Sequence, residues 1–95
     1  MIVIGSFKDR VTKELCRTGY SRRLGPGLSR VSRRKLAQIH FATRLEDLRV
    51  PPGNRLESLR GDRAGQYSIR VNDQWWICFV WRESDAYDIE LVDYY

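Results

Sequence analysis

Four arginines along residues 51–75 have a spacing that could hold a phosphate group. The segment reads as a proline–glycine turn, a short strand, a glycine-bounded reversal and a second strand, and it carries Arg55, Arg60, Arg63 and Arg70. The planar guanidinium group offers forked hydrogen-bond donors and keeps its charge when it is partly dried. Arginines held on a sheet in this way predict a phosphate-binding surface.

Cleavage of RNA without a metal ion is the chemistry that fits the residues around these arginines. RNA brings its own nucleophile, the 2′-hydroxyl, and a protein must accept its proton, stabilise charge on the phosphate and protonate the leaving 5′-oxygen. Arginine can stabilise the charge, a carboxylate can act as the base, and a neutral tyrosine can orient or donate. The expected strands carry these types at Glu57, Arg60, Arg63, Arg70, Asp93 and Tyr94.

The spacing of these residues does not show that they converge on one site. Glu57 and Arg60 are three residues apart, so they face opposite sides of an ideal strand and share a site only at a bulge or a strand end. Arg63 follows Asp62 in the expected turn, where the two residues could simply fix the reversal.

Other kinds of catalytic site have less support. His40 is the only histidine, and its apolar neighbours on an expected helix favour a packing or surface role over a Ser-His-Asp triad. Cys16 and Cys78 lie far apart without metal-site spacing, so we expect a reduced protein with no metal or other cofactor. A single disulfide in a secreted domain is the alternative. No glycine-rich phosphate loop is present.

The chain is short and its charge is unevenly divided. With 95 residues, 42% of them hydrophobic, we expect one domain over residues 1–95 with a single core. No signal peptide or membrane-spanning length is visible, so a cytoplasmic location is expected. Residues 1–50 carry a net charge of +8 and residues 51–95 carry −3. The basic stretch at residues 22–35 suits RNA, DNA, a ribosome surface or an acidic protein, or is simply a solvated helix face.

Periodicity and turn residues predict the elements that must position the candidate site. We expect a strand at residues 1–7, a helix at 8–18 ended by Gly19, a basic loop at 20–27 and a second helix at 28–44, with a further turn to residue 50. Strands are expected at residues 55–60, 66–71, 75–81 and 87–94. The order β-α-α-β-β-β-β predicts an α+β fold in which two helices pack on one face of a mostly antiparallel sheet.

The second expected helix has one apolar side. Its inward arc is predicted to comprise Leu28, Val31, Leu36, Ile39 and Ala42. Lys35 falls inside this arc, where its stem can pack while its amine reaches water. Phe41 points away from the core and is a candidate partner contact.

The run PPGNRLESLRGDRAGQYSIRVNDQW, together with the ending VDYY, resembles the HigB toxins of bacterial toxin–antitoxin pairs, within the RelE superfamily. The likeness covers essentially the whole chain, although the first 35 residues match loosely. It implies a fold like that of a microbial ribonuclease and an endonuclease that cleaves mRNA in the A site of the 70S ribosome. It also implies a HigA-like helix-turn-helix antitoxin that neutralises the toxin and represses their operon, so that operator DNA is reached only through the antitoxin.

The resemblance assigns site residues unevenly. Arg60 and Arg70 match basic site residues of the family, and Asp93 with Tyr94 matches its terminal Asp-Tyr pair. Glu57 stands where some members have histidine, although glutamate is also familiar there. By this comparison the catalytic candidates are Glu57, Arg60, Arg70, Asp93, Tyr94 and Tyr95, and Trp76 is a candidate for binding RNA. The other RNA-binding candidates, Arg63, Arg22, Arg23 and Arg33, follow from their positive charge.

Two of these positions depart from the family pattern. Trp76 stands where arginine is common, and an indole can stack on a base but supplies no charge at the phosphate. Tyr95 stands where histidine is common, and a tyrosine, with a reference pKa of about 10, is a poor base at neutral pH. Three functions therefore stay open: a ribosome-dependent mRNA endonuclease, a catalytically weakened toxin that still binds ribosome or antitoxin, and a plain basic nucleic-acid-binding module.

Overall fold

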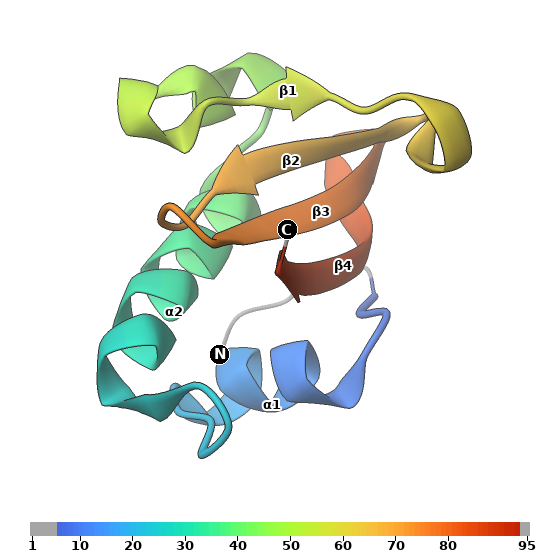
Figure 1. The fold of residues 1–95 in the computed structure, drawn as a ribbon. Helices are drawn as coiled ribbons and strands as arrows, with labels where there is room; N and C mark the ends of the chain where they lie inside the picture. The colour runs from blue at the N-terminus through green and yellow to red at the C-terminus, as the bar shows by residue number, and fades with distance from the viewer. Residues whose placement is uncertain (1–5, 94–95) are drawn as a thin grey trace.

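The computed structural model describes residues 6–93, in which two helices lie on one side of a four-stranded sheet (Figure 1). The helices are α1 (Arg10–Thr18) and α2 (Gly25–Phe41). The strands are β1 (Glu57–Ser58), β2 (Gln66–Arg70), β3 (Trp75–Arg82) and β4 (Asp85–Asp93). They lie in chain order and every neighbouring pair is antiparallel. The predicted α+β fold is confirmed.

Helix α1 has the boundaries that its end residues favour. The Asp9 side chain accepts a hydrogen bond from the backbone N–H of Thr12 at 3.0 Å and so caps the first turn. Gly19 closes the helix in the left-handed region, at φ 83°, and its N–H donates to Leu15. The Thr12 hydroxyl then accepts from the backbone N–H of Leu91 on β4 at 3.0 Å. This last bond ties α1 directly to the sheet.

Helix α2 begins and ends earlier than predicted. It starts at Gly25 because Pro26 can occupy the first turn, where a missing N–H costs nothing. It ends at Phe41, which is 75% exposed as expected. The chain then forms a separate 3₁₀ helix, Leu45–Arg49, whose start is held by Asp47 through the backbone N–H groups of Thr43 and Arg44.

A buried asparagine connects α2 to the segment before β1. Asn54 is fully buried, and its amide donates to the side chain of Gln38 and to the backbone carbonyl of Leu48. Its Oδ1 accepts from the Lys35 amine, so that amine is bound to Asn54, where the sequence had suggested water. Desolvation lowers the pKa of Lys35, and the charges of Arg34 and Arg70 lower it further.

The first strand after the helices is much shorter than the predicted residues 55–60. Arg55 adopts a left-handed conformation, φ 48°, after the 3₁₀ turn Pro52–Asn54. A further 3₁₀ turn at Gly61–Arg63 begins soon after β1 ends, so only Glu57–Ser58 pairs with β2. The expected strand at residues 1–7 falls largely outside the described residues, within which Phe7 forms a parallel bridge to Ile89.

The core lies between the helices and the sheet. As predicted, β3 is an interior strand, and Ile77, Cys78 and Phe79 at its centre have no exposed surface. Trp75 and Trp81 are partly buried and pack against this core. Among the described residues, no helix has both the length and the apolar character needed to cross a membrane.

Candidate active site

The pairing of the strands divides their side chains between two faces of the sheet. Paired residues of neighbouring strands point to the same face, and successive residues of one strand alternate. Ile69 and Ile77 form such a pair and belong to the buried core under the helices. The opposite face, here called the polar face, carries Glu57, Gln66, Ser68, Arg70, Trp76, Cys78, Glu90 and Val92.

Glu57, Arg70 and Trp76 are the sequence-predicted site residues that the structure brings together on the polar face. Glu57 pairs with Ser68, and Arg70 lies two residues further along β2. Trp76 pairs with Arg70 across β2 and β3. Paired residues lie about 4.5–5.5 Å apart at Cβ and diagonal neighbours about 7–8 Å apart, so one nucleotide could touch all three side chains.

Arg70 has an exchangeable partner. Its Nη2 donates to Oδ1 of Asp73, and the Asp73 side chain is 98% exposed whereas that of Arg70 is 26% exposed. Ion pairs with a solvated member contribute little to stability. A phosphate group could therefore replace Asp73 as the partner of this guanidinium.

Arg63 is held in a different way. Its Nη1 donates to Glu90 on β4 at 3.0 Å and to Gln66 on β2 at 3.1 Å. Because Gln66 and Glu90 belong to strands that flank β3, the Arg63 side chain crosses the polar face over β3. Gln66 and Glu90 therefore help to fix the turn through Arg63, and a role of Arg63 in binding RNA stays a prediction.

Arg60 lies just beyond β1 and is exposed. It directly precedes the 3₁₀ turn Gly61–Arg63. In a continuous strand, alternation would place Arg60 and Glu57 on different faces of the sheet. Because β1 ends at Ser58, this constraint does not apply to Arg60. The strand end that a shared site requires is present, and the proximity of Arg60 to Glu57 stays a prediction.

Asp93 and its neighbours are not assembled with Glu57 and Arg70 by the described structure. Asp93 pairs with Trp75 and is two residues from Leu91, which places it on the helix side of the sheet at the last residue of β4. Its Oδ2 accepts from the side chain of Gln74 at 2.9 Å. Tyr94 and Tyr95 lie outside the described residues, so a catalytic role for this terminus stays a prediction.

The three basic RNA-binding candidates from the first half of the chain lie apart from the polar face. Arg22 and Arg23 are exposed in the segment between α1 and α2, and Arg33 is exposed on α2. A Cβ atom added to Gly19 would lie 3.0 Å from Cδ of Arg33, so the Arg33 stem runs close over the end of α1. The candidates thus divide into a polar-face group and a helix-side group.

Comparison with known proteins identifies the family of this chain. The sequence matches, over residues 5–95, the family described as the RelE-like toxin of the type II toxin–antitoxin system HigB. The chain belongs to the HigB-like toxins. It is 38% identical over 81 residues to Toxin HigB-1 of Vibrio cholerae serotype O1, covering 84% of this chain and 85% of that protein. It is also 38% identical over 64 residues to an uncharacterized protein of Haemophilus influenzae, covering 67% of this chain and 63% of that protein.

Family membership confirms the resemblance seen in the sequence. A toxin of a type II system is one member of a pair, so this HigB-like toxin has an antitoxin as its partner. Toxins of the HigB and RelE families are generally endoribonucleases.

Three residues of the toxin's polar face were missed at the sequence level. Ser68 lies between Glu57 and Cys78 in the strand pairing, is fully buried, and has an Oγ atom without a hydrogen-bond partner. The alternation of β2 could have placed it beside Arg70. Cys78 lies in an apolar run that does not indicate which face of the sheet it occupies. The position of Glu90 on the polar face follows only from the strand register.

The cysteines of the toxin are structural. Cys16 and Cys78 are buried and unpaired with each other. Burial raises the pKa of the Cys16 thiol, an effect that the charge of Arg33 partly opposes, so Cys16 is a weak nucleophile. Within residues 6–93 no group of three or more His, Cys, Asp or Glu side chains could hold a metal ion.

Proposed function

We propose that this HigB-like toxin is an endoribonuclease that cleaves mRNA in the A site of the 70S ribosome, with the polar face as its active surface. The observation that carries the proposal is the placement of Glu57, Arg70 and Trp76 as neighbours on one face of the sheet. Metal-free cleavage by the 2′-hydroxyl requires a base, a cation at the phosphate and an acid for the leaving oxygen. Glu57 and Arg70 can supply the first two, and Trp76 can stack on a base. Cleavage would stop translation and growth, and we place it in the cytoplasm, where ribosomes work.

Each group has a role that its position supports. Glu57 is exposed at the sheet edge and accepts the proton of the attacking 2′-hydroxyl. Arg70, once its exposed partner Asp73 is displaced, stabilises charge on the phosphate. Arg60, which follows β1 toward the start of β2, binds a neighbouring phosphate of the mRNA. Trp76 stacks on a base next to the scissile bond. Protonation of the leaving 5′-oxygen is assigned to the neutral tyrosines of the chain terminus, Tyr94 and Tyr95, because Asp93 lies on the helix side of the sheet.

The partner that restrains this activity is proposed to be a HigA-like antitoxin with a helix-turn-helix domain. Such a protein would neutralise the toxin and would carry it to operator DNA, which the toxin alone does not bind. A helix-turn-helix reading frame beside the toxin gene is the sequence observation that this part of the proposal expects.

The test is cleavage on programmed ribosomes. Purified toxin, added to 70S ribosomes that hold a defined mRNA, is expected to generate new 5′ ends at the A-site codon, which primer extension maps. Glu57→Gln should lower the cleavage rate about 100-fold or more because it removes the base. The matched control Glu46→Gln alters an exposed glutamate of the 3₁₀ helix Leu45–Arg49 and should cleave like the parent. Soluble parent protein that yields no new ends, or equal cleavage of free mRNA, contradicts the proposal.

A second candidate, a toxin with weakened cleavage, is favoured by one observation. Trp76 stands on the polar face directly opposite Arg70, at a position where an arginine would supply a second cation to the phosphate. Replacement of Trp76 by Arg, alone and with Tyr95→His, distinguishes the two candidates. A gain in cleavage of about tenfold or more indicates a weakened toxin, since one charge donor at a transition state is worth at least that much. An unchanged or lower rate indicates that Trp76 serves the reaction as it stands.

A further inference from the structure

A large unpaired positive charge lies on the helix side of the molecule. Within residues 8–35 the acidic residues are Asp9 and Glu14 alone. Lys8 pairs with Glu90, whereas eight other basic side chains of this region form no ion pair with an acidic group among residues 6–93. They are all exposed, and they are Arg10, Lys13 and Arg17 on α1, Arg22 and Arg23 in the following segment, and Arg30, Arg33 and Arg34 on α2. We call this set the cationic surface.

The polar face does not account for the cationic surface. The two helices pack on the core side of the sheet, whereas Glu57 and Arg70 point to the opposite side. Unpaired like charges repel one another, so maintaining this many on a small domain opposes folding slightly. A partner of negative charge would relieve that repulsion.

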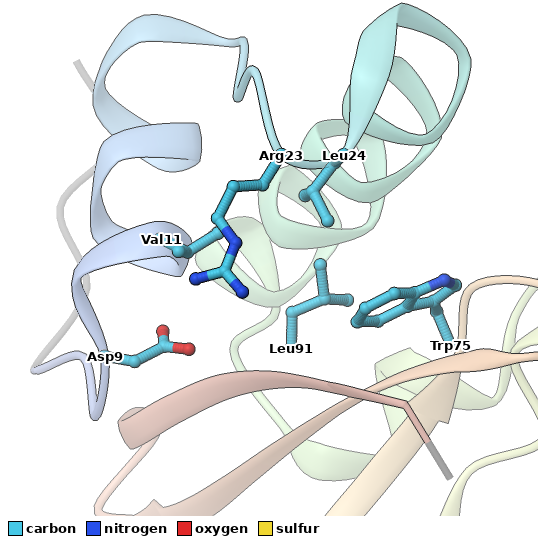
Figure 2. Close-up of a pocket in the computed structure, with 6 residues that line it drawn as sticks. All are labelled: Asp9, Val11, Arg23, Leu24, Trp75 and Leu91. Atoms are coloured by element: carbon cyan, nitrogen blue, oxygen red, sulfur yellow. The ribbon is translucent and has the colours of Figure 1, made fainter. Parts of the chain in front are cut away.

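A pocket with four apolar side chains in its lining opens within the cationic surface, and Asp9 and Arg23 complete that lining. It lies where α1, the segment after it and the end of the sheet meet, and its volume is about 150 Å³. Figure 2 shows Trp75, Leu91 and Leu24 directed into one space, with Arg23 extending beside Val11 and with Asp9 on the side opposite Trp75. An adjoining hollow shares Val11 and Arg23 and is bordered by Arg10 and Arg22. A cavity of about this volume holds a benzene ring, so the pocket has room for one large apolar side chain.

We propose that the cationic surface is the docking site of an acidic protein segment that inserts one large apolar side chain into this pocket. An RNA backbone would engage the arginines but leaves an apolar pocket unused, whereas an acidic segment with an apolar anchor uses both features. A buried apolar anchor surrounded by charged contacts is also how protein interfaces concentrate their affinity. The toxin's antitoxin is the partner expected to supply the segment. The inference thus rests on the antitoxin part of the proposed function and is independent of mRNA cleavage.

The test measures binding of the antitoxin encoded beside the toxin gene. Arg10→Glu removes a surface charge at the start of α1, and Val11→Asn removes an apolar wall of the pocket. Each should raise the Kd at least about tenfold, as loss of an interface anchor or central charge does. The matched controls are Arg49→Glu and Val50→Asn, both exposed and outside the cationic surface, and they should bind like the parent. Thermal unfolding of each variant confirms that it is folded, and Arg10→Glu, being fully on the surface, stays informative if Val11→Asn is not.

Parallel binding to 30S ribosomal subunits separates the two kinds of polyanion. The proposal is overturned if Arg10→Glu weakens ribosome binding but leaves the antitoxin Kd unchanged, which assigns the surface to RNA. It is also overturned if Val11→Asn binds antitoxin like the parent although folded, because the pocket is then unused. Parent toxin that cleaves mRNA while both variants bind antitoxin normally removes this inference and leaves the proposed nuclease standing. In the reverse case, the parent toxin does not cleave mRNA but the two variants selectively lose antitoxin binding. That result removes the proposed nuclease and leaves the proposed interface standing.

Discussion

The two faces of the sheet are built from the same strands but serve different ends. On the helix side, Ile69, Ile77 and Phe79 are apolar, have no exposed surface and hold the two helices in place. On the polar face, the buried positions Ser68 and Cys78 are small, and the larger side chains around them include charged and aromatic ones, among them Glu57, Arg70, Trp76 and Glu90. One face therefore supplies the free energy of folding while the other is free to carry charges. Substitutions on the two faces should separate stability from activity.

The largest effect on stability is expected at the centre of the helix side. Phe79→Ala removes a fully buried ring that stacks against Tyr67 and Trp81, and such truncations cost about 3–5 kcal/mol in free energy of unfolding. Urea denaturation followed by tryptophan fluorescence measures this loss. Glu57→Gln on the polar face is the matched comparison and should stay within about 0.5 kcal/mol of the parent. A loss at Phe79 no larger than that at Glu57 would mean that the two faces are not divided as described.

A smaller effect is expected at the ion pair that crosses the polar face. Arg63→Gln breaks the 3.0 Å contact to Glu90, whose side chain is only 17% exposed, while Arg63 is 31% exposed. Partial exposure limits the loss to about 1 kcal/mol in free energy of unfolding. Because Arg63 fixes the turn that follows Arg60, the rate of cleavage on ribosomes should also fall. Expressed as a free energy, this loss should exceed the loss in free energy of unfolding. The control Arg82→Gln removes an exposed arginine that lies over the Tyr87 ring, close to the turn between β3 and β4. Equal loss of cleavage from both variants would show that Arg63 has no special effect on the turn.

The division of the sheet explains how far the sequence could predict the site. Two-residue alternation correctly predicted β2, because one buried face imposes that period, and a run that is apolar on both parities correctly predicted the interior strand β3. The prediction of a strand over residues 55–60 was wrong in length, because the left-handed Arg55 and the turn at Gly61–Arg63 leave only two paired residues. Helix α2 was predicted to start too late, because Pro26 was taken as a loop residue although a first helical turn accepts it.

The register between strands could not be predicted from the sequence. Neither the neighbourhood of Glu57 and Arg70 nor the bond from Arg63 to Glu90 has a signal in local spacing, since each joins different strands. The position of Asp93 on the helix side likewise follows from its pairing with Trp75. The family resemblance named these residues, and only the strand pairing showed which of them are neighbours.

The smallest effect is expected at the edge between the two faces, where the Lys35 amine meets Asn54. Desolvation, helped by Arg34 and Arg70, lowers the pKa of Lys35 below its usual 10.5 in the folded protein. As pH rises toward 10.5 the folded state releases this proton first, so the unfolded state binds more protons and the free energy of unfolding increases with pH in that window. Lys35→Met should lack this increase. Urea denaturation of both proteins at a series of pH values gives two curves of free energy of unfolding against pH, and their difference separates the effect of Lys35 from that of other titrating groups. Lys13→Met, which removes an exposed lysine of α1, should follow the parent. A parent curve that falls relative to Lys35→Met over the same window would mean that Asn54 holds the charged amine more strongly than desolvation opposes it.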